Sequence, residues 1–513
     1  MLDRQLETAP VGRLAAVRQW VLVPANQLLV LLLVLAAFPL LFELGRTPVQ
    51  LWDEARLAMG AMEMSRGGNW LVVNYDGQPD HWSVKPPLLI WLQAISFKLL
   101  GYNALALRLP SALAGFGTVV VLYRFAAYRL GRPWAGFFGC LVLVTAGGYV
   151  RLHGIRTGDY DGLLAFWEVL VWISFFEYLE TGRARHLYWL GGALVAAVLT
   201  KGVAGLLGGP ALLLYALLRG KLLWLLRQWR LYAVAVVCAA VIASYYLARE
   251  HYDPGYIKLV RENELGGRFG TVVEGHTGPW SFYFDTLYAK DFAGWVWWWL
   301  LPMVLIWLQP SRLVRRAGGL LLLFVLGWLL VLSGSATKID WYAIPTYPPL
   351  ALLIGLGLDF LYHDVLAAYL PRLPRWGGWL LRGALVLLVF FLPYRATMNQ
   401  LISQRQGDLG IDSDNSLARY LVETMRSRTW VSTPTLLYKG GYNAALAFYS
   451  KVFNDLEHRS IVVRYVGEHR QLQPGTTVLV CDPIYRTRLD SAFQLTTVYQ
   501  DFPCETIMLG QKK

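Results

Sequence analysis

The first long polar segment of the chain carries an acidic residue and an arginine three positions apart. The segment begins near Leu51 and contains Asp53 and Arg56. The residues that follow, up to Arg66, are rich in Ala, Met and Glu and predict a helix. Asp53 could cap that helix and pair with Arg56. It could instead act as a general base for a hydroxyl that attacks a phosphate-activated carbon, beside an arginine that holds the anion. The spacing leaves both interpretations open.

A lysine in the same segment is followed directly by two prolines. Lys85, Pro86 and Pro87 precede an apolar block, and the prolines fix an extended turn there. Lys85 is therefore predicted to lie at the lipid boundary. It could snorkel toward water, as interfacial lysines commonly do, or bind a lipid phosphate.

The short segment 151–162 is densely charged and has apolar sequence on both sides. It contains Arg151, Arg156, Asp159 and Asp161, with glycines between them. Charges at a membrane boundary are costly. The two carboxylates and two arginines could neutralise one another, or they could line a polar cavity above the bilayer. The cost favours the cavity.

Further polar residues stand beside apolar blocks in three other places. Lys201 lies between two short blocks, and Lys338 and Tyr342 lie before a late one. The segment 250–293 contains the others: Arg261, Glu262, Glu264, Arg268 and His276. Each of these groups could face a lipid headgroup.

The composition excludes most soluble proteins. The 513 residues are 56% apolar and 16% charged, whereas soluble domains are about 25% charged. The apolar residues form separate blocks of unequal length, which excludes a repeat solenoid, a coiled coil and a disordered chain. The net charge of +13 follows the positive-inside pattern described below, so no nucleic-acid partner is predicted. A multi-pass membrane protein in contact with membrane lipids remains.

The blocks predict a mainly α fold, a polytopic helical bundle with about 11 to 13 spans. The predicted spans are 25–44, 108–126, 134–151, 162–180, 186–200, 203–219, 231–249, 294–309, 318–335, 342–361 and 378–396. The block 86–101 contains Gln93 and Lys98, and is interpreted as an interfacial helix.

The arginines and lysines indicate one orientation. With the N-terminus in the cytoplasm, the cytoplasmic segments carry few acidic residues and these basic ones: Arg4, Arg13, Arg18, Arg124, Arg129, Arg132, Arg183, Arg185, Arg219, Lys221, Arg227, Arg230, Arg312, Arg315, Arg316, Arg372 and Arg375. This is the positive-inside pattern. Loops 45–107 and 250–293 and the tail are then extracytoplasmic.

The chain divides into a membrane module, 1–396, and a polar C-terminal region, 397–513, that is predicted to be a small extracytoplasmic α/β domain. Helices are expected at 416–426 and 442–451, and strands at 429–432, 461–465 and 476–481. Cys481 and Cys504 lie here and could form a disulfide in an oxidising compartment. Cys140 and Cys238 lie in apolar blocks.

Taken in order along residues 20–396, these motifs resemble the GT-C membrane glycosyltransferases. The closest branch comprises the bacterial lipid A aminoarabinose transferases and the protein O-mannosyltransferases. The resemblance implies a bacterial inner-membrane enzyme that inverts the sugar while transferring it on the extracytoplasmic face. Its donor would be a polyprenyl (undecaprenyl) phosphate-linked sugar, and its acceptor lipid A or another glycolipid of the cell envelope.

The resemblance also implies roles for individual residues. Asp53 and Asp161 match catalytic carboxylates, and Lys85, Arg268 and Arg56 match the cations at the donor phosphate. The predicted substrate-binding residues are Glu54, Asp159, Lys201, His276, Lys338 and Tyr342.

The resemblance fails at the metal site. Aminoarabinose transferases have a glutamate just before the loop lysine, and it forms a metal site with a later histidine; here that position is Val84. His276 therefore lacks its expected partner, although Asp80 or His81 could substitute. A divalent metal remains possible, and no other cofactor is predicted.

Three alternatives stay open. The acceptor could be a protein hydroxyl, as for the O-mannosyltransferases. The chain could instead be a transporter or flippase of lipid-linked sugars, but the charges cluster at the outer ends of the spans and no internal repeat is visible. A structural scaffold would require every charged cluster to be a self-satisfied turn.

Overall fold

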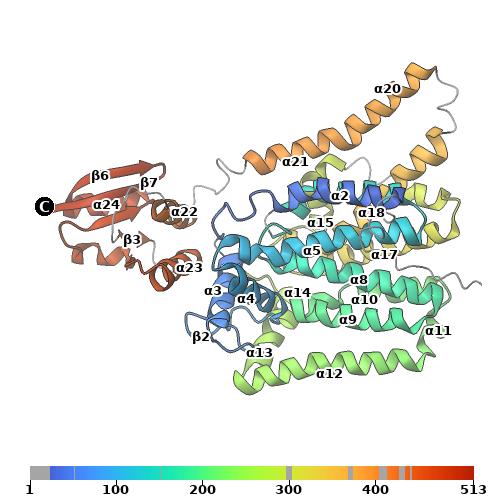
Figure 1. The fold of residues 1–513 in the computed structure, drawn as a ribbon. Coiled ribbons are helices and arrows are strands. Elements are labelled where there is room, and N and C mark those ends of the chain that lie inside the picture. Colours follow the sequence, from blue (N-terminus) through green and yellow to red (C-terminus); the bar gives the residue numbers. More distant parts are fainter. Residues whose placement is uncertain are drawn as a thin grey trace, which may run out of the picture.

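The structure is a computed structural model and describes residues 23–50, 52–151, 153–295, 303–367, 374–403, 413–426, 434–438 and 442–513. A helical bundle forms most of it, and a smaller domain with a β-sheet lies at one end (Figure 1).

Seven helices in the described residues are long and apolar enough to cross a membrane. They are α2 (Pro24–Leu41), α5 (Ala104–Arg124), α8 (Tyr160–Thr181), α9 (Ala184–Lys201), α12 (Trp229–Tyr252), α17 (Arg312–Gly334) and α18 (Tyr347–Phe360). Single turns of tighter or wider helix extend three of them: Phe125–Arg129 after α5, Gly202–Leu206 after α9, and Asp340–Thr346 and Leu361–Leu366 on either side of α18. The prediction of a multi-pass, mainly α bundle is confirmed.

Shorter helices complete the bundle. They are α3 (Asp53–Ser65), α4 (Leu88–Leu100), α6 (Pro133–Thr145), α7 (Gly147–Val150), α10 (Gly209–Leu218), α11 (Leu222–Leu226), α13 (Tyr256–Val260), α14 (Arg268–Gly270), α15 (Phe282–Thr286), α20 (Arg375–Val386) and α21 (Leu392–Ser403). Other single turns are Arg261–Gly267, Leu287–Asp291, Ala293–Trp295 and Leu387–Phe391. The helices predicted after Asp53 and over 86–101 are both present.

Two predicted spans differ in the structure. The span 134–151 breaks at Ala146, whose backbone is extended (ψ 119°), so that α6 ends and the short α7 begins. The span 203–219 starts as a tight turn, and the α-helix α10 begins only at Gly209. Close packing explains the turn, since a Cβ at Gly205 would lie 2.5 Å from the Ala197 carbonyl carbon. Much of the predicted span 294–309 lies outside the described residues.

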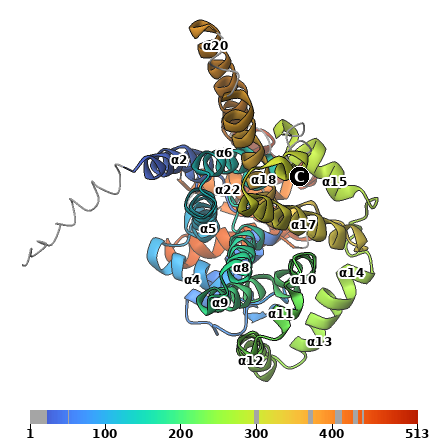
Figure 2. The same cartoon turned by 90° about the vertical axis from the view of Figure 1, so that its right-hand side faces the viewer.

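The centre of the bundle is tightly packed. Helix α18 lies against α6 because Gly355 and Gly139 let the backbones approach; a Cβ at Gly355 would lie 2.3 Å from the Ala135 carbonyl oxygen. Small residues permit such contacts between membrane helices. Helix α8 is central and α12 lies at the edge, while α20 extends away from the bundle (Figure 2).

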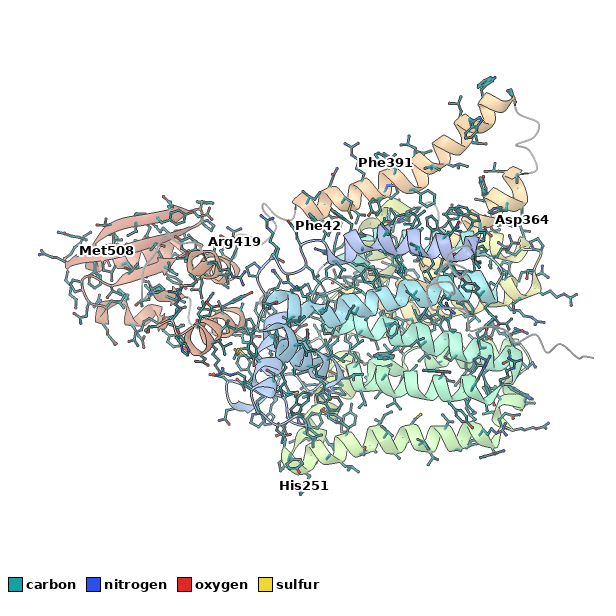
Figure 3. All side chains as sticks on the ribbon, viewed as in Figure 1. Phe42, His251, Asp364, Phe391, Arg419 and Met508 are labelled. Carbon is teal, nitrogen blue, oxygen red and sulfur yellow. A yellow bond between two sulfur atoms is a disulfide. The ribbon has the colours of Figure 1, made fainter. Side chains whose placement is uncertain are left out.

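Three arginines at one end of the bundle form ion pairs with glutamates of α8. Arg129 pairs with Glu177, and Arg219 and Arg316 both pair with Glu180. These arginines belong to the set that sequence analysis assigned to the cytoplasm. In Figure 3, Asp364 lies at this end, while Phe42 and His251 lie at the opposite end, toward the β-sheet domain.

The C-terminal domain contains a five-stranded sheet in the order β4-β3-β5-β7-β6. Its strands are β3 (Pro434–Tyr438), β4 (Val462–Tyr465), β5 (Thr477–Val480), β6 (Phe493–Asp501) and β7 (Cys504–Lys512), and its helices are α22 (Ser413–Arg426), α23 (Ala444–Lys451) and α24 (Pro483–Ala492); single turns are Val452–Leu456 and Val466–Gln471. Strand β3 pairs in parallel with β4 and β5, whereas β7 is antiparallel to β5 and β6.

The predicted α/β character of this region is confirmed, and so are the helices near 416–426 and 442–451 and the strands near 461–465 and 476–481. The strand predicted at 429–432 lies outside the described residues. The C-terminal hairpin of β6 and β7 was not predicted. The boundary at 396/397 stays a prediction.

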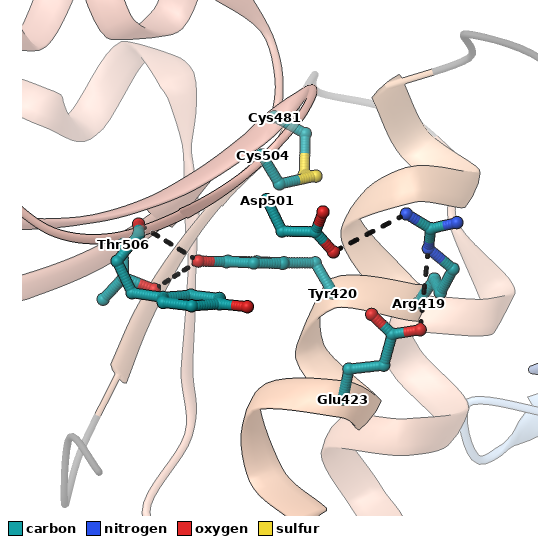
Figure 4. The surroundings of a disulfide bond; sticks show 8 residues. Arg419, Tyr420, Glu423, Cys481, Asp501, Cys504 and Thr506 are labelled. Carbon is teal, nitrogen blue, oxygen red and sulfur yellow. Dashed lines mark hydrogen bonds and ion pairs between the residues drawn. A yellow bond between two sulfur atoms is a disulfide. The ribbon is translucent and has the colours of Figure 1, made fainter. Parts of the chain in front are cut away.

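Cys481 and Cys504 form a disulfide. It joins the end of β5 to the start of β7, beside Tyr420 of α22 (Figure 4). The Tyr420 hydroxyl hydrogen-bonds Thr506 at 2.7 Å. The disulfide that the sequence analysis gave as a possibility is therefore present.

The bundle and the C-terminal domain share one hydrophobic core. Ala58 of α3 and Phe97 of α4 belong to the same buried cluster as Leu421 of α22 and Phe448 of α23. The Phe97 and Phe448 rings stack with centroids 6.0 Å apart. Helix α3 is therefore fixed from both sides. A two-stranded hairpin, β1 (Asn74–Tyr75) and β2 (Gln78–Pro79), follows α3.

Replacing both Cys481 and Cys504 by serine is expected to lower the free energy of unfolding of the C-terminal domain by about 3 kcal/mol, because the crosslink restricts the unfolded chain. Thermal unfolding of the purified protein checks this, with reduced wild type as the control that should match the variant. An unchanged unfolding temperature would contradict it.

Candidate active site

A cavity opens at the end of the bundle that faces the C-terminal domain. It has a volume of about 100 Å³, and we call it the deep cavity. Its lining residues come from five parts of the chain: Lys85, Asp161, Leu164, Lys201, Val203, Ala204, Leu207, Glu264, Phe269, Trp328, Val331, Leu332, Ser335, Thr337 and Tyr342. Apolar side chains form most of the wall, and charged ones gather on one side.

The main charged group of the deep cavity is an ion pair. Lys201, the last residue of α9, donates to Asp161, in the first turn of α8, at 2.5 Å, and both are buried. The Lys201 ammonium also lies 4.3 Å from the centroid of the Tyr342 ring. All three residues were candidates in the sequence analysis, and they are in contact in the structure.

Lys85 lies between the deep cavity and a second, smaller one. The small cavity is lined by Asp53, Arg56, Leu57, Val73, Asp80, Trp82, Ser83, Lys85, Ile90 and Tyr160. The Lys85 ammonium lies 5.5 Å from the Tyr160 ring centroid. Among the described residues it has no carboxylate partner. Lys85 is thus a half-buried cation without a counterion, at the wall common to both cavities.

Asp53 occupies the first turn of α3 and lines the small cavity. The residue before it, Trp52, lies just outside the helix and makes no side-chain cap. Within the described part of the chain, the Asp53 carboxylate has neither a hydrogen bond nor an ion pair. The cap and the pairing with Arg56 that the sequence allowed are therefore both wrong, and the carboxylate is available for chemistry.

Asp53 belongs to a compact group with His153 and Asp159. One potential ligand atom from each lies within 4.8 Å of the others. His153 pairs with Asp159 at 3.3 Å and stacks on Trp341 with the ring centroids 3.7 Å apart. The three side chains could hold a divalent cation between them.

Electrostatics favour a charged imidazole in this group. Burial by itself would lower the pKa of His153, but Asp159, Asp53 and Asp161 outweigh burial and raise the pKa to about 9. Burial likewise opposes ionisation of Asp159, yet His153 and Thr157 hold the pKa of that carboxyl below its usual value. His153 therefore carries a positive charge between carboxylates at neutral pH.

Arg56 lines the small cavity and is paired with Asp80. Its guanidinium makes two hydrogen bonds to Asp80, at 2.8 and 2.6 Å. Tyr75, Trp82 and Tyr442 surround it, with ring centroids 4.6 to 5.4 Å from the guanidinium carbon. Asp80 also accepts the backbone N–H groups of Trp82 and Ser83. The pair thus shapes the turn that leads to Lys85.

The two arginines of segment 151–162 do not form ion pairs with its two aspartates. Arg156 donates to the carbonyls of Pro39 and Phe42, and Arg151 donates to Gln400. Asp161 instead lines the deep cavity, as described above. Of the two interpretations offered by the sequence, the polar cavity is the one that the contacts support.

Two predicted substrate-binding residues hold the fold together instead. Buried Glu54 is bound by Arg108 through two hydrogen bonds, at 2.6 and 2.8 Å. The Lys338 ammonium donates to the carbonyls of Leu332, Ser333 and Ser335, which satisfies the C-terminal end of α17. Neither side chain lines the deep or the small cavity.

The donor-phosphate prediction for Arg268 cannot be compared, because its side chain lies outside the described residues. His276 is exposed, and its nearest carboxylate is Glu274, at 4.0 Å.

The residues present do not fit the metal site that the resemblance implied. Val84 is buried, and its carbonyl accepts the Tyr256 hydroxyl. The suggested substitutes have other partners: His81 lies 2.8 Å from Asp253, and Asp80 binds Arg56. No metal cluster that includes His276 occurs among the described residues.

Sequence reasoning missed His153 and Tyr160 as site residues, and it named Glu264 as a possible headgroup contact without placing it at a cavity. His153 and Tyr160 flank the acidic residues of segment 151–162, so their proximity to Asp159 and Asp161 was a usable signal. Glu264 lies far from both in sequence and only the packing of the loop against the bundle brings it to the deep cavity.

Comparisons with known proteins agree with this architecture. A family model described as dolichyl-phosphate-mannose-protein mannosyltransferase matches residues 84–246. An undecaprenyl phosphate-alpha-4-amino-4-deoxy-L-arabinose arabinosyl transferase of Pseudomonas savastanoi is 31% identical over 334 residues, which are 64% of this chain and 60% of that protein. One from Pseudomonas fluorescens is 31% identical over 380 residues, 70% of this chain and 65% of that protein. The chain thus spans under two thirds of the length of these relatives.

The fold itself matches over nearly the whole chain. A crystal structure of ArnT from Cupriavidus metallidurans bound to undecaprenyl phosphate has a TM-score of 0.67 at 19% identity, covering 94% of this chain and 98% of that one. The apo structure of the same protein gives a TM-score of 0.64.

The chain is a multi-pass membrane protein whose fold is of the GT-C type, like that of ArnT. It is a protein of the inner membrane that is similar to the aminoarabinose transferases and, over residues 84–246, to the protein mannosyltransferases.

His153→Gln is expected to lower stability by up to roughly 3 kcal/mol below pH 6.5, because a raised histidine pKa stabilises the folded state there. The loss should disappear as the pH rises through about 9, the pKa of His153 in the folded protein. Unfolding temperatures of wild type and variant at pH 6 and pH 10 check this.

Exposed His458 of the C-terminal domain provides the control, and His458→Gln should leave the unfolding temperature unchanged at both pH values. An equal difference between wild type and His153→Gln at pH 6 and pH 10 would show that the charge of His153 is not what stabilises this loop.

Proposed function

We propose that the chain is an inverting glycosyltransferase that moves a sugar from a polyprenyl phosphate to a cell-envelope acceptor, lipid A or another glycolipid. The observation that carries the proposal is Lys85, a cation without a counterion among the described residues, between the deep cavity and the small cavity that contains Asp53. The matched relatives are named for undecaprenyl phosphate-linked aminoarabinose, and the ArnT structure holds undecaprenyl phosphate.

The deep cavity suits the lipid part of such a donor. Leu164, Leu207, Trp328, Val331 and Leu332 form an apolar wall beside the charged side. A prenyl chain would lie along that wall, and its phosphate would reach Lys85. A fixed cation in a water-poor site stabilises the charge that develops on a departing phosphate. Arg268 is proposed as a second cation there, by its position in the loop.

Transfer requires one bond to form and one to break. The acceptor oxygen attacks the anomeric carbon from the side of the small cavity, and the bond from that carbon to the phosphate oxygen breaks, which inverts the configuration. The lipid phosphate leaves with the bonding electrons toward Lys85. Asp53 takes the proton of an acceptor hydroxyl, or orients an acceptor that is already a phosphate.

The remaining polar residues would position the sugar. Asp161 and Lys201 neutralise each other and present both a donor and an acceptor to the deep cavity, with Tyr342 beside them. Asp159 would orient His153, to which it is paired, and His153 in turn lies near Asp53. Asp161 is thus proposed to bind or orient the sugar rather than to accept a proton, since Lys201 already occupies one of its oxygens.

The proposed orientation puts the N-terminus in the cytoplasm and the C-terminal domain outside it. The arginine-rich end of the bundle then faces the cytoplasm, as the positive-inside rule requires. The disulfide between Cys481 and Cys504 suits an oxidising compartment on the other side.

The transporter alternative receives little support. A lipid-sugar carrier should have polar groups that face one another near the bilayer midplane. Glu168, buried within α8, has no hydrogen-bond or ion-pair partner in the described part of the chain. A single unpartnered carboxylate does not make a translocation path. A protein acceptor remains the alternative within the enzyme class, because the family model that matches is named for protein mannosyltransferases.

Asp53→Asn and Lys85→Ala are each expected to lower kcat/KM by about 100- to 1,000-fold, through the loss of the base and of the phosphate cation. The assay follows radiolabel from undecaprenyl-phosphate sugars into a mixed envelope-lipid fraction, with purified protein in detergent. Lys98→Ala is the matched control, because Lys98 is an exposed lysine in the last turn of α4 and lines neither cavity.

Label in added protein alone would favour the protein acceptor. Wild type that transfers no sugar from any donor, but moves labelled donor across reconstituted vesicles, would exclude the glycosyltransferase and restore the transporter.

A further inference from the structure

The C-terminal domain reaches the segment that carries Asp53. The Tyr442 hydroxyl donates to the backbone carbonyl of Trp52, at 3.1 Å, and the Tyr449 hydroxyl accepts the backbone N–H of Val49, at 2.8 Å. Helix α23 packs along α3 (Figure 1). Contacts therefore come from residues about 400 positions away in sequence to the few residues just before Asp53.

The backbone at Trp52 needs such support. Its φ of 74° and ψ of −125° lie where residues with a Cβ are rarely found. Such a conformation persists only when surrounding contacts enforce it. Because Trp52 directly precedes α3, its conformation sets the direction in which the Asp53 side chain leaves the helix.

The Trp52 carbonyl is held by two donors. The backbone N–H of Arg56 donates to it at 3.1 Å, as the first hydrogen bond of α3, and the Tyr442 hydroxyl supplies the other. The Tyr442 and Trp52 rings also stack, with centroids 5.8 Å apart. A single tyrosine of the C-terminal domain thus contacts both the carbonyl and the side chain of the residue before Asp53.

Tyr442 also closes the aromatic group around Arg56. Its ring centroid lies 5.4 Å from the guanidinium carbon, next to the rings of Tyr75 and Trp82. Arg56 in turn binds Asp80, which holds the turn before Lys85. Tyr442 is therefore linked to Asp53 through Trp52, and to the turn before Lys85 through Arg56 and Asp80.

We infer that Tyr442 is a positioning residue through which the C-terminal domain fixes Asp53 for transfer. The inference rests on the proposed function and assigns the domain a part in it. Tyr442 lines neither cavity and would touch no substrate. Its removal should therefore lower kcat while leaving the affinity for the lipid phosphate in the deep cavity unchanged.

Two variants separate the hydroxyl from the ring. Tyr442→Phe removes only the hydrogen bond to Trp52, and kcat should fall about fivefold, the effect of one ordinary hydrogen bond. Tyr442→Ala also removes the aromatic contacts, and kcat should fall about 100-fold, as expected when a catalytic group is misplaced by about 1 Å. The matched control is Tyr499→Phe, at an exposed tyrosine of β6.

The measurements use the full-length protein in detergent. They are kcat and donor KM for sugar transfer, equilibrium binding of radiolabelled undecaprenyl phosphate, and amide hydrogen exchange of residues 49–57. Tyr442→Ala should bind undecaprenyl phosphate as tightly as wild type and exchange the amides of 49–57 faster. Tyr499→Phe should match wild type in all three measurements.

The inference is overturned if Tyr442→Ala retains wild-type kcat, or if weaker binding of undecaprenyl phosphate accounts for its whole loss of activity. It is also overturned if exchange in 49–57 is unchanged. The last readout needs no activity, so wild type that transfers no sugar would refute the proposed function and still leave the role of Tyr442 tested.

Discussion

The buried ion pair of Glu54 and Arg108 organises the end of the bundle at which both cavities open. Glu54 accepts two hydrogen bonds from Arg108 and one each from the backbone N–H groups of Gln50 and Gly158. Arg108 also donates to the carbonyls of Leu44, Thr47 and Pro48. One pair thereby joins the segment before α3, the helix α3 itself, α5 and the loop before α8. A buried pair is tolerated only when its remaining donors and acceptors are satisfied, and here the backbone of two loops satisfies them.

This arrangement explains why the proposed catalytic residues come from such distant parts of the sequence. Asp53 is the neighbour of Glu54 on α3, and Asp159 is the neighbour of Gly158, which donates to Glu54. The pair therefore holds the backbone beside both carboxylates, and His153 lies between them. Helix α4 begins after the turn that Asp80 and Arg56 shape, which brings Lys85 to the same place. The conformation of the segment before α3 and that of the loop before α8 therefore both depend on contacts with the same ion pair.

The sequence predicted the elements better than the contacts. Long apolar blocks predicted the spans because hydrocarbon accepts only helices whose backbone groups are all satisfied. The break at Ala146 and the tight turn at Gly202 were not predictable in this way, since they depend on how closely neighbouring helices approach. The partners of polar residues were the least predictable. Glu54 is paired with Arg108, 54 positions later, and Arg56 with Asp80, and the sequence predicted neither pair.

The difference between paired and unpaired charges separates the residues that support the site from those that would perform chemistry. An unpaired charge near the hydrocarbon is costly, so a fold that serves stability alone would pair it or replace it. Arg108 and Arg56 are paired with Glu54 and Asp80, and the ammonium of Lys338 is used by the end of α17. Among the described residues, Lys85 and Asp53 make no ion pair within 4.0 Å, although Asp53 lies near the charged ring of His153. In the proposed reaction, a phosphate bound at Lys85 and an acceptor bound at Asp53 would offset the cost of leaving these charges without an ion pair.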